Sequence, residues 1–301
     1  MKRRRQSLLA GAVAMCLAPA ATFATAAQPL ERHVRVGALE RSYLVDLPPA
    51  YDGKRALPAV LVFHGGGGAA ASARAQTRMS EKGSAEGFIA VYPQGSGVLS
   101  TRLLTWNAET CCSYAMQHRV DEAAFVAALL DDLEAAFAID RARVYATGIS
   151  NGGMMAYLAA CTLADRFTAI AVVSGELTLS DCRLARPVSV LVIHGSADQN
   201  LPYDGGVGAK ALARHPARSV RFAVDFWRAR DGCAAVSDNR RDGSVARERY
   251  GPCSADSAVE LVTIEGGGHS WPGGARLARF LDAPSTALDA TDEIWAFFTR
   301  H

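Results

Sequence analysis

The chain has 301 residues, of which 50% are hydrophobic and 21% are charged, and its formal net charge is +2. This composition is typical of a globular enzyme and excludes a disordered or fibrous protein. Residues 1–27 hold four basic residues and no acidic ones, so the rest of the chain carries a formal charge of −2 and has no basic stripe that would indicate a nucleic-acid partner.

The first 27 residues have the order of a secretory signal peptide. Basic residues at positions 2–5 precede an apolar run at positions 8–21, which is too short to span a bilayer, and small residues follow at positions 24–27. We expect cleavage of this segment, no stable membrane insertion afterwards, and a secreted or periplasmic protein. The pair Arg4 and Arg5 leaves both the general and the twin-arginine export routes open.

The cysteines also favour export. Of the seven, only Cys16 lies in the leader, and the even number that remains indicates disulfides in an exported chain. The pairs predicted from proximity along the chain are Cys233 with Cys253, Cys161 with Cys182, and Cys111 with Cys112. No metal site is predicted, because no two cysteines have the short gap of a zinc knuckle.

From residue 28 onward, the pattern of the sequence predicts one α/β domain over residues 28–301. Alternating apolar and polar residues on both sides of Gly37 predict a β-hairpin, short apolar runs predict buried strands, and apolar residues three and four apart predict helices. The later strands are predicted at residues 59–63, 88–92, 144–147, 169–173, 188–193 and 259–264, and the helices at 120–138, 154–160, 220–228 and 289–298. Their alternation predicts a mostly parallel sheet with helices on both faces, and residues 229–256 are expected to form an irregular excursion tied by a disulfide.

Residues 148–152 read Gly-Ile-Ser-Asn-Gly and match the G-x-S-x-G nucleophile elbow. The motif lies between a predicted strand and a predicted helix, which is the context that the elbow requires. A nucleophile on so sharp a turn needs small neighbours, because a side chain at either glycine would collide with the adjoining strand or helix. We therefore predict that Ser150 is the nucleophile, at the positive end of a helix.

A serine nucleophile needs a general base, and on this fold the order along the chain is serine, acid, histidine. His269 follows the predicted strand 259–264 through three glycines, which can bring an imidazole to the serine. His215 lies in a polar stretch and His301 is the last residue, so neither has a fixed scaffold. His194 precedes every plausible acid and is predicted to be structural.

The predicted triad acid is Asp198. It stands just past the predicted strand 188–193, at the carboxyl edge where parallel sheets gather functional residues. Asp204 is the nearest rival, but it lies further into a loop that contains proline and glycine.

An acyl-transfer site also needs donors for the oxyanion. We predict the backbone N–H groups of Asn151, next to the nucleophile, and of Gly66, in the glycine loop after residue 63, with Gly65 as the alternative. A phosphate-binding loop is disfavoured because no Gly-Lys-Ser/Thr follows. Trp106 and Trp271 are predicted to line the acyl pocket, with core packing an equal alternative for Trp271.

Several motifs together resemble one family. They are Leu47-Pro48-Pro49 with Tyr51, His64-Gly65-Gly66, Trp106-Asn107 before Cys111-Cys112, Val120-Asp121 with Phe125, residues 148–154, His194-Gly195 with Asp198, and residues 268–272. From about Val34 to the C-terminus the chain resembles the polyhydroxybutyrate depolymerase and feruloyl esterase family of secreted α/β-hydrolases. The resemblance implies an α/β-hydrolase fold and cofactor-free hydrolysis of carboxylic esters by Ser150, Asp198 and His269. The chain departs from the family pattern at residues 108–110, where a glycine is common in the family.

The family's substrates are aliphatic polyesters and hydroxycinnamoyl esters of plant polysaccharide. Because no separate polymer-binding domain is recognisable after the catalytic core, small or oligomeric esters are the expected substrates. Two alternatives are a serine peptidase of the same fold and an inactive hydrolase-fold binding protein. The ordered serine, acid and histidine argue against the second, since a binding role does not need all three.

Overall fold

The computed structural model describes residues 28–182, 184–211, 215–279 and 281–301, so the predicted signal peptide lies outside the described residues. The strands are β1 (Leu30–Val36), β2 (Leu39–Asp46), β3 (Leu57–Phe63), β4 (Ile89–Pro93), β5 (Ile139–Ile149), β6 (Ala169–Val173), β7 (Ser189–Gly195), β8 (Val236–Asp242), β9 (Val245–Tyr250) and β10 (Val259–Ile264). The helices are α1 (Ala70–Thr77), α2 (Met79–Glu86), α3 (Ser113–Gln117), α4 (Glu122–Ala136), α5 (Asn151–Thr162), α6 (Val220–Arg230) and α7 (Ala290–Phe298).

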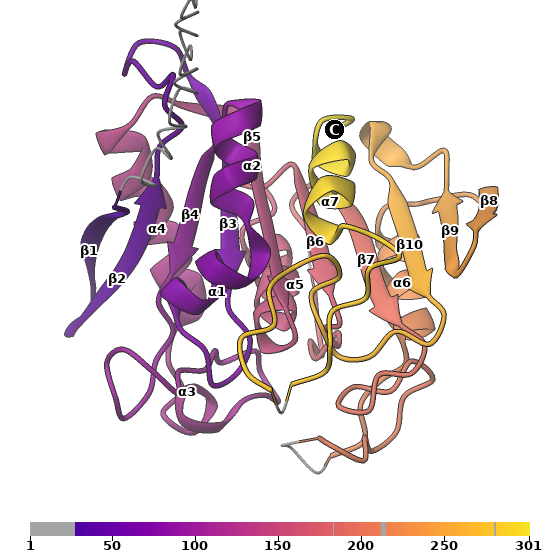
Figure 1. Cartoon of the computed structure of the whole chain (residues 1–301). Helices are drawn as coiled ribbons and strands as arrows, with labels where there is room; N and C mark the ends of the chain where they lie inside the picture. The colour runs from indigo at the N-terminus through magenta and orange to yellow at the C-terminus, as the bar shows by residue number, and fades with distance from the viewer. Residues whose placement is uncertain (1–27, 183, 212–214, 280) are drawn as a thin grey trace, which may run out of the picture.

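The strands of the described chain form one sheet in the order β1-β2-β4-β3-β5-β6-β7-β10-β9-β8 (Figure 1). From β4 to β10 neighbouring strands are parallel, whereas β1 and β2 on one side and β9 and β8 on the other pair antiparallel. The predicted mostly parallel sheet is therefore confirmed. Parallel strands need crossover connections, and the helices between them provide these.

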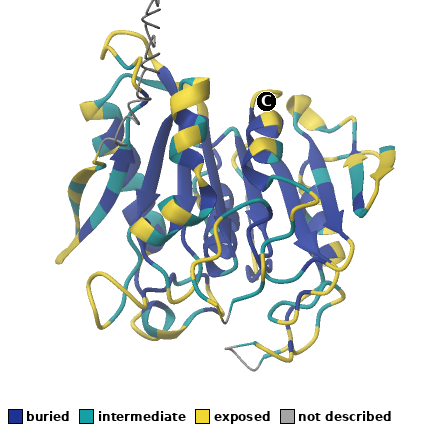
Figure 2. Ribbon diagram, in the orientation of Figure 1, coloured by how far each residue is buried: buried dark blue, intermediate teal, exposed yellow. Residues whose placement is uncertain are grey.

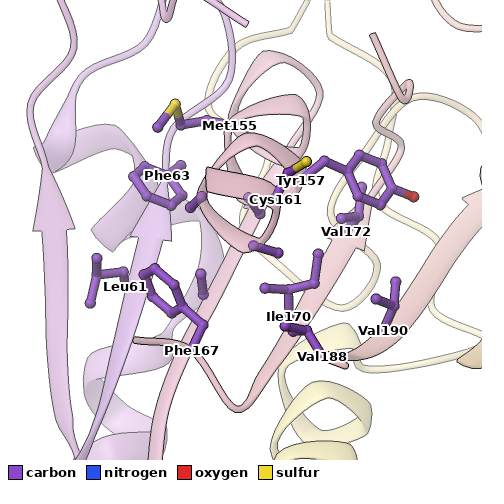
Figure 3. Close-up of a cluster of buried hydrophobic side chains, with 14 of the residues drawn as sticks. Leu61, Phe63, Met155, Tyr157, Cys161, Phe167, Ile170, Val172, Val188 and Val190 are labelled. Atoms are coloured by element: carbon purple, nitrogen blue, oxygen red, sulfur yellow. The ribbon is translucent and has the colours of Figure 1, made fainter. Parts of the chain in front are cut away.

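Helices cover both faces of the sheet, as predicted. Helices α1, α2 and α7 pack on one face, and α4, α5 and α6 pack on the other (Figure 1). Each face has its own apolar core, and the central strands between them are mostly buried, although β5 is buried only from Val144 onward (Figure 2). Figure 3 shows part of the core under α5, where Met155 and Tyr157 of the helix lie over Phe63, Ile170 and Val172 of the strands.

The predicted bounds are most accurate where a strand is buried on both faces. Strands β6 and β10 begin and end at the predicted residues, and every predicted strand and helix is present. Helices α1 and α2 were not predicted, because their short sequences lack a regular apolar spacing.

The prediction of an irregular excursion over residues 229–256 is wrong. This segment forms the β8–β9 hairpin, and β9 extends the sheet by pairing with β10. The two strands read Val-Ser-Asp-Asn-Arg-Arg-Asp and Val-Ala-Arg-Glu-Arg-Tyr, so they lack the apolar run or alternation from which strands are predicted. They are strands because β10 offers its edge, which is a tertiary effect.

The structure joins the three predicted cysteine pairs, namely Cys111 with Cys112, Cys161 with Cys182, and Cys233 with Cys253. The second pair ties the end of α5 to the segment after β6. The third closes the segment that contains the β8–β9 hairpin. Among the described residues, no helix combines the length and the apolar character needed to cross a membrane.

Candidate active site

The candidate site lies at the carboxyl edge of the parallel strands, the lower edge of the sheet in Figure 1. Ser150 follows β5, Asp198 comes shortly after β7, and His269 comes shortly after β10. The glycine loop that starts at His64 follows β3, which is the neighbour of β5. Because these strands are parallel, their carboxyl ends meet at one edge, where α/β proteins place their ligands.

Ser150 stands on a strained turn between β5 and α5. Its backbone has φ 57° and ψ −125°, a conformation that side-chain-bearing residues rarely adopt. The two flanking glycines make the turn possible. A Cβ atom on Gly148 would overlap with Gly152, and one on Gly152 would overlap with the Phe63 carbonyl of β3. The close approach of strand and helix that the motif predicts is therefore present.

The acid and the base form a direct pair. His269 Nδ1 lies 2.7 Å from Asp198 Oδ2, and the Asp198 side chain is fully buried. Burial raises the pKa of Asp198, but hydrogen bonds from His194 and His269 outweigh it and hold the pKa below its usual range. Since an ionised carboxylate can only accept, His269 donates from Nδ1 and leaves Nε2 as the nitrogen able to accept a proton.

Backbone packing brings the acid and base loops together. A Cβ atom on Gly195 would overlap with the Gly267 carbonyl, so the end of β7 passes directly against the loop of His269. The Ala197 N–H donates to the same carbonyl at 2.9 Å. Asp282 fixes the base from the other side, because its Oδ2 accepts from the His269 N–H at 2.9 Å.

His194 contacts the acid as well. Its Nε2 lies 2.9 Å from the Leu201 carbonyl and 3.4 Å from Asp198 Oδ2, and the side chain is buried. Asp198 Oδ1 accepts from the N–H groups of Asn200 at 2.8 Å and Leu201 at 2.9 Å. Both oxygens of the Asp198 carboxylate therefore have partners, which fixes the orientation of the carboxylate toward His269.

The geometry joins Asp198 to His269 but leaves the serine apart from them. Among the described residues, no hydrogen bond joins Ser150 Oγ to His269. Such contacts are often loose without substrate and tighten in the reacting complex.

The glycine loop presents the N–H of Gly66. The Gly65 carbonyl accepts from His64 Nδ1 at 2.8 Å and from the Gly68 N–H at 3.0 Å. Because carbonyl and N–H point in opposite directions in a trans peptide, the Gly66 N–H is turned away from these bonds. Gly66 also adjoins the elbow, since a Cβ atom placed on it would lie 3.6 Å from Asn151 Cβ. This arrangement favours Gly66 over Gly65 as the predicted donor.

The orientation of this peptide depends on His64, whose role the sequence analysis missed. The imidazole is buried, and its Nε2 accepts from the Gly95 N–H at 3.1 Å. Burial lowers the pKa of His64 to about 4, so the ring is neutral and one nitrogen donates while the other accepts. The only sequence signal was the position of His64 directly before the glycines.

The structure corrects the prediction that Trp106 lines the acyl pocket. The indole has 0% exposure and packs edge-on against Phe63. Its Nε1 donates to the His64 carbonyl at 2.9 Å, and its backbone N–H donates to Asn151 Oδ1 at 2.8 Å. Trp106 therefore connects the glycine loop to the elbow, and its indole has no exposed surface that a substrate could contact.

Trp271 is also in the core rather than in a pocket. Its indole has 0% exposure, and Nε1 donates to Thr291 Oγ1 of α7 at 3.0 Å. The core alternative stated for this residue is the one that the structure supports.

Three rejected residues lie outside the pair of acid and base. Asp204 is not among the partners of His269. His215 lies 3.5 Å from Glu176, and His301 packs against Phe297 of α7.

A groove of about 580 Å³ opens beside β8, β9 and α7, but most of its lining residues are arginines and acids, and none is a candidate site residue. Among the described residues, no group of three or more histidines, cysteines and acids could hold a metal ion.

Comparison with known proteins identifies the family. A family described as "Putative esterase" matches residues 38–249. The chain is 29% identical over 263 residues to the "Putative esterase NocK" of Nocardia uniformis subsp. tsuyamanensis, which covers 81% of this chain and 74% of that protein. It is 27% identical over 238 residues to feruloyl esterase B of Piromyces equi, covering 76% of this chain and 42% of that protein, so it spans less than half of that relative. The solved acetyl xylan esterase from Aspergillus awamori matches with a TM-score of 0.61 at 14% identity, over 90% of this chain and 100% of that one.

The sheet order, the helices on both faces and the structural match define an α/β-hydrolase fold, as predicted. Within this class, the chain belongs to the putative esterase family and is a carboxylic ester hydrolase. The resemblance to feruloyl esterases inferred from the sequence is confirmed.

Proposed function

We propose that this enzyme is a secreted serine esterase that acts through Ser150, Asp198 and His269. The observation that carries the proposal is the 2.7 Å pair of His269 Nδ1 and Asp198 Oδ2 at the sheet edge where Ser150 occupies a strained elbow. A buried acid, an oriented imidazole and a serine hydroxyl are the three parts that acyl transfer needs.

In the first half of the reaction, His269 Nε2 takes the proton of the Ser150 hydroxyl as the oxygen attacks the ester carbonyl. The tetrahedral oxyanion accepts hydrogen bonds from the N–H groups of Gly66 and Asn151. His269 then gives its proton to the departing alcohol, which leaves an acyl group on Ser150. Asp198 stabilises the imidazolium that forms in between.

In the second half, His269 takes a proton from water as the water oxygen attacks the acyl carbon. The same two N–H groups stabilise the second oxyanion. Collapse of this intermediate returns the proton to Ser150 and releases the carboxylic acid. Loss of a single oxyanion donor typically lowers kcat by roughly 10² to 10³-fold, so the orientation of the Gly66 peptide is central to the rate.

The proposed substrates are feruloyl or other hydroxycinnamoyl esters, or oligoesters of the polyhydroxybutyrate type. Feruloyl esterases among the relatives support the first class, and the sequence resemblance supports both. The chemistry of the proposed site is the same for either, because only the acyl and alcohol groups differ. No cofactor has a role in this scheme.

The test is to compare initial rates of the wild-type enzyme and Ser150→Ala on methyl ferulate, a short nitrophenyl ester and a hydroxybutyrate oligomer. We expect Ser150→Ala to lose turnover on every ester that the wild type hydrolyses, and the preferred ester to identify the substrate class. Turnover that survives unchanged in Ser150→Ala would overturn the mechanism.

The proposed export rests on the leader pattern of residues 1–27 and is consistent with the three cysteine pairs. Expression of the full chain in a bacterial host, followed by N-terminal sequencing of the protein outside the cytoplasm, tests it. We expect the mature chain to begin close to Ala27. A full-length protein that stays in the cytoplasm with its leader would contradict export.

A further inference from the structure

A small apolar cluster lies apart from the two cores that cover the sheet. Its buried members are Ala108, Cys111 and Met154, and the half-buried Cys112 and Leu201 pack against them. These residues come from three segments: the loop before α3, the first turn of α5, and the loop after β7. Two of these segments carry Ser150 and Asp198, so the cluster is part of the same sheet edge as the proposed triad.

Hydrogen bonds connect the cluster to the catalytic groups. The Met154 N–H donates to the Ser150 carbonyl at 3.0 Å, one turn into the helix that starts at the nucleophile. The Leu201 N–H donates to Asp198 Oδ1 at 2.9 Å. The side-chain Nδ2 of Asn151, the residue whose backbone N–H is a proposed oxyanion donor, lies 3.9 Å from Cys111 Sγ. The cluster therefore borders the nucleophile, the acid and an oxyanion donor at once.

The loop that carries Cys111 and Cys112 is also hydrogen-bonded to the segment after β6. The Glu109 carboxylate accepts from Ser180 N–H at 2.8 Å and from Ser180 Oγ at 2.9 Å. Ser180 lies two residues before Cys182, whose disulfide partner Cys161 is on α5. Glu109 belongs to the segment, residues 108–110, where the sequence departs from the resembled family.

The chemistry of the cluster is apolar and rich in sulfur. Its members include no charged side chain, and Cys111, Cys112 and Met154 together contribute three sulfur atoms. Sulfur makes favourable contacts with the edges of aromatic rings. Trp106 and Trp271 are fully buried and cannot supply an aromatic wall instead.

We propose that this sulfur-lined cluster receives the acyl group and gives the enzyme its preference for aromatic acids over short aliphatic ones. Cys112 and Leu201, which keep part of their surface exposed, contact the ring, while Met154 and Cys111 support them from behind. The proposal rests on Ser150 as the acylated residue and specifies which acyl group that residue accepts.

The test compares two esters that differ only in the acyl group, 4-nitrophenyl ferulate and 4-nitrophenyl acetate. In Leu201→Ala, we expect kcat/KM for the ferulate to fall roughly tenfold more than kcat/KM for the acetate. Met154→Leu replaces the flexible side chain that supports Cys112 and Leu201 with a branched one of similar volume, and we expect a loss of about threefold that is confined to the ferulate. The matched control is Leu39→Ala, which truncates an exposed leucine on β2 and leaves both rates unchanged.

The rate of labelling by diisopropyl fluorophosphate reports whether each variant still has an assembled nucleophile. With labelling at the wild-type rate, an unchanged ferulate-to-acetate ratio in both Leu201→Ala and Met154→Leu would overturn the proposed acyl site. Failure of the underlying function has a different signature, because the wild-type enzyme itself would then hydrolyse neither ester through Ser150.

Discussion

Two regions of the same sheet, the interior strand β7 and the edge strand β8, differ in burial and in the contacts that hold them. Every residue of β7, which leads to the acid, is buried, whereas six of the seven residues of β8 are exposed (Figure 2). We call the carboxyl edge of the parallel strands, which carries the proposed triad, the catalytic edge. It depends on backbone approaches without spare space, such as Gly195 against Gly267. The β8–β9 hairpin is instead lined by ion pairs at the surface, such as Arg247 with Glu293.

The difference teaches where precision resides in this molecule. Close packing and buried hydrogen bonds allow one arrangement, so they can fix a peptide or an imidazole for catalysis. Exposed ion pairs contribute little free energy and tolerate change. Substitutions at the catalytic edge should therefore be costly, and equivalent substitutions in the hairpin should not.

The largest effect is expected from Asp198→Asn. The amide keeps the shape of the side chain but removes the charge that orients and stabilises His269, so kcat should fall about 10⁴-fold. Steady-state kinetics on a nitrophenyl ester measure this. An Asp204→Asn variant is the control, because Asp204 was the rival acid, and it should keep its rate. A small loss in Asp198→Asn with a large loss in Asp204→Asn would reverse the assignment.

A buried acid at the base of the hairpin sharpens the comparison. Asp231 ends α6 and is fully buried, and burial raises its pKa to about 7. Since the pKa is higher in the folded than in the unfolded chain, ionisation opposes folding, and stability falls as pH rises from about 4 through about 7. Relative to the wild type, Asp231→Asn should gain about 2 to 4 kcal/mol between pH 5 and pH 8.

Urea unfolding of both proteins across this pH range measures the gain from Asp231→Asn. Asp238→Asn on β8, which changes a half-buried aspartate paired with Arg240 at 2.8 Å, is the matched control for the exchange itself. A constant difference between Asp231→Asn and the wild type would show that Asp231 does not titrate in this range.

His64→Phe tests whether the glycine loop is positioned by its histidine. The substitution keeps a buried ring but removes the hydrogen bonds to the Gly65 carbonyl and the Gly95 N–H. Release of the Gly66 peptide should lower kcat about 10²-fold with a smaller change in KM, because the oxyanion forms only during reaction.

Trp106→Phe provides the comparison for His64→Phe. It removes the bond from Nε1 to the His64 carbonyl but leaves the Gly65 carbonyl bonds in place. We expect a smaller loss of kcat than in His64→Phe. Equal rates in wild type and His64→Phe would remove His64 from the account.

The sequence predicted those parts of the fold and site that follow from local pattern. Strand β6 is a continuous apolar run and β10 is mostly apolar. Ser150 lies in a motif whose two glycines leave no space for a side chain. The β8–β9 hairpin escaped prediction because its strands are charged and exist only through pairing with β10. The sequence around a tryptophan is the same whether its side chain packs in the core or binds a substrate, so the predicted role of Trp106 was wrong. The contacts of His64 with the Gly65 carbonyl and the Gly95 N–H depend on the loop conformation, which the spacing of residues does not predict.

The smallest effect is expected in the hairpin. Arg247→Ala removes a two-bond ion pair with Glu293, at 2.9 and 2.8 Å, between β9 and α7. Both side chains are partly exposed, so stability should fall by no more than about 1 kcal/mol, with kcat unchanged. Urea unfolding and esterase rates check both. A large loss of activity would show that the hairpin and the catalytic edge are coupled, against the contrast drawn above.

The central claim is that the catalytic edge works through Ser150, and covalent labelling tests it most directly. The purified enzyme is treated with a fluorophosphonate, the loss of esterase activity is followed, and the modified peptide is sequenced by mass spectrometry. We predict that the label is found on Ser150 in proportion to the activity lost, and that Ser150→Ala takes up none. A label on another residue, or full activity in a protein whose Ser150 is modified, would contradict the account.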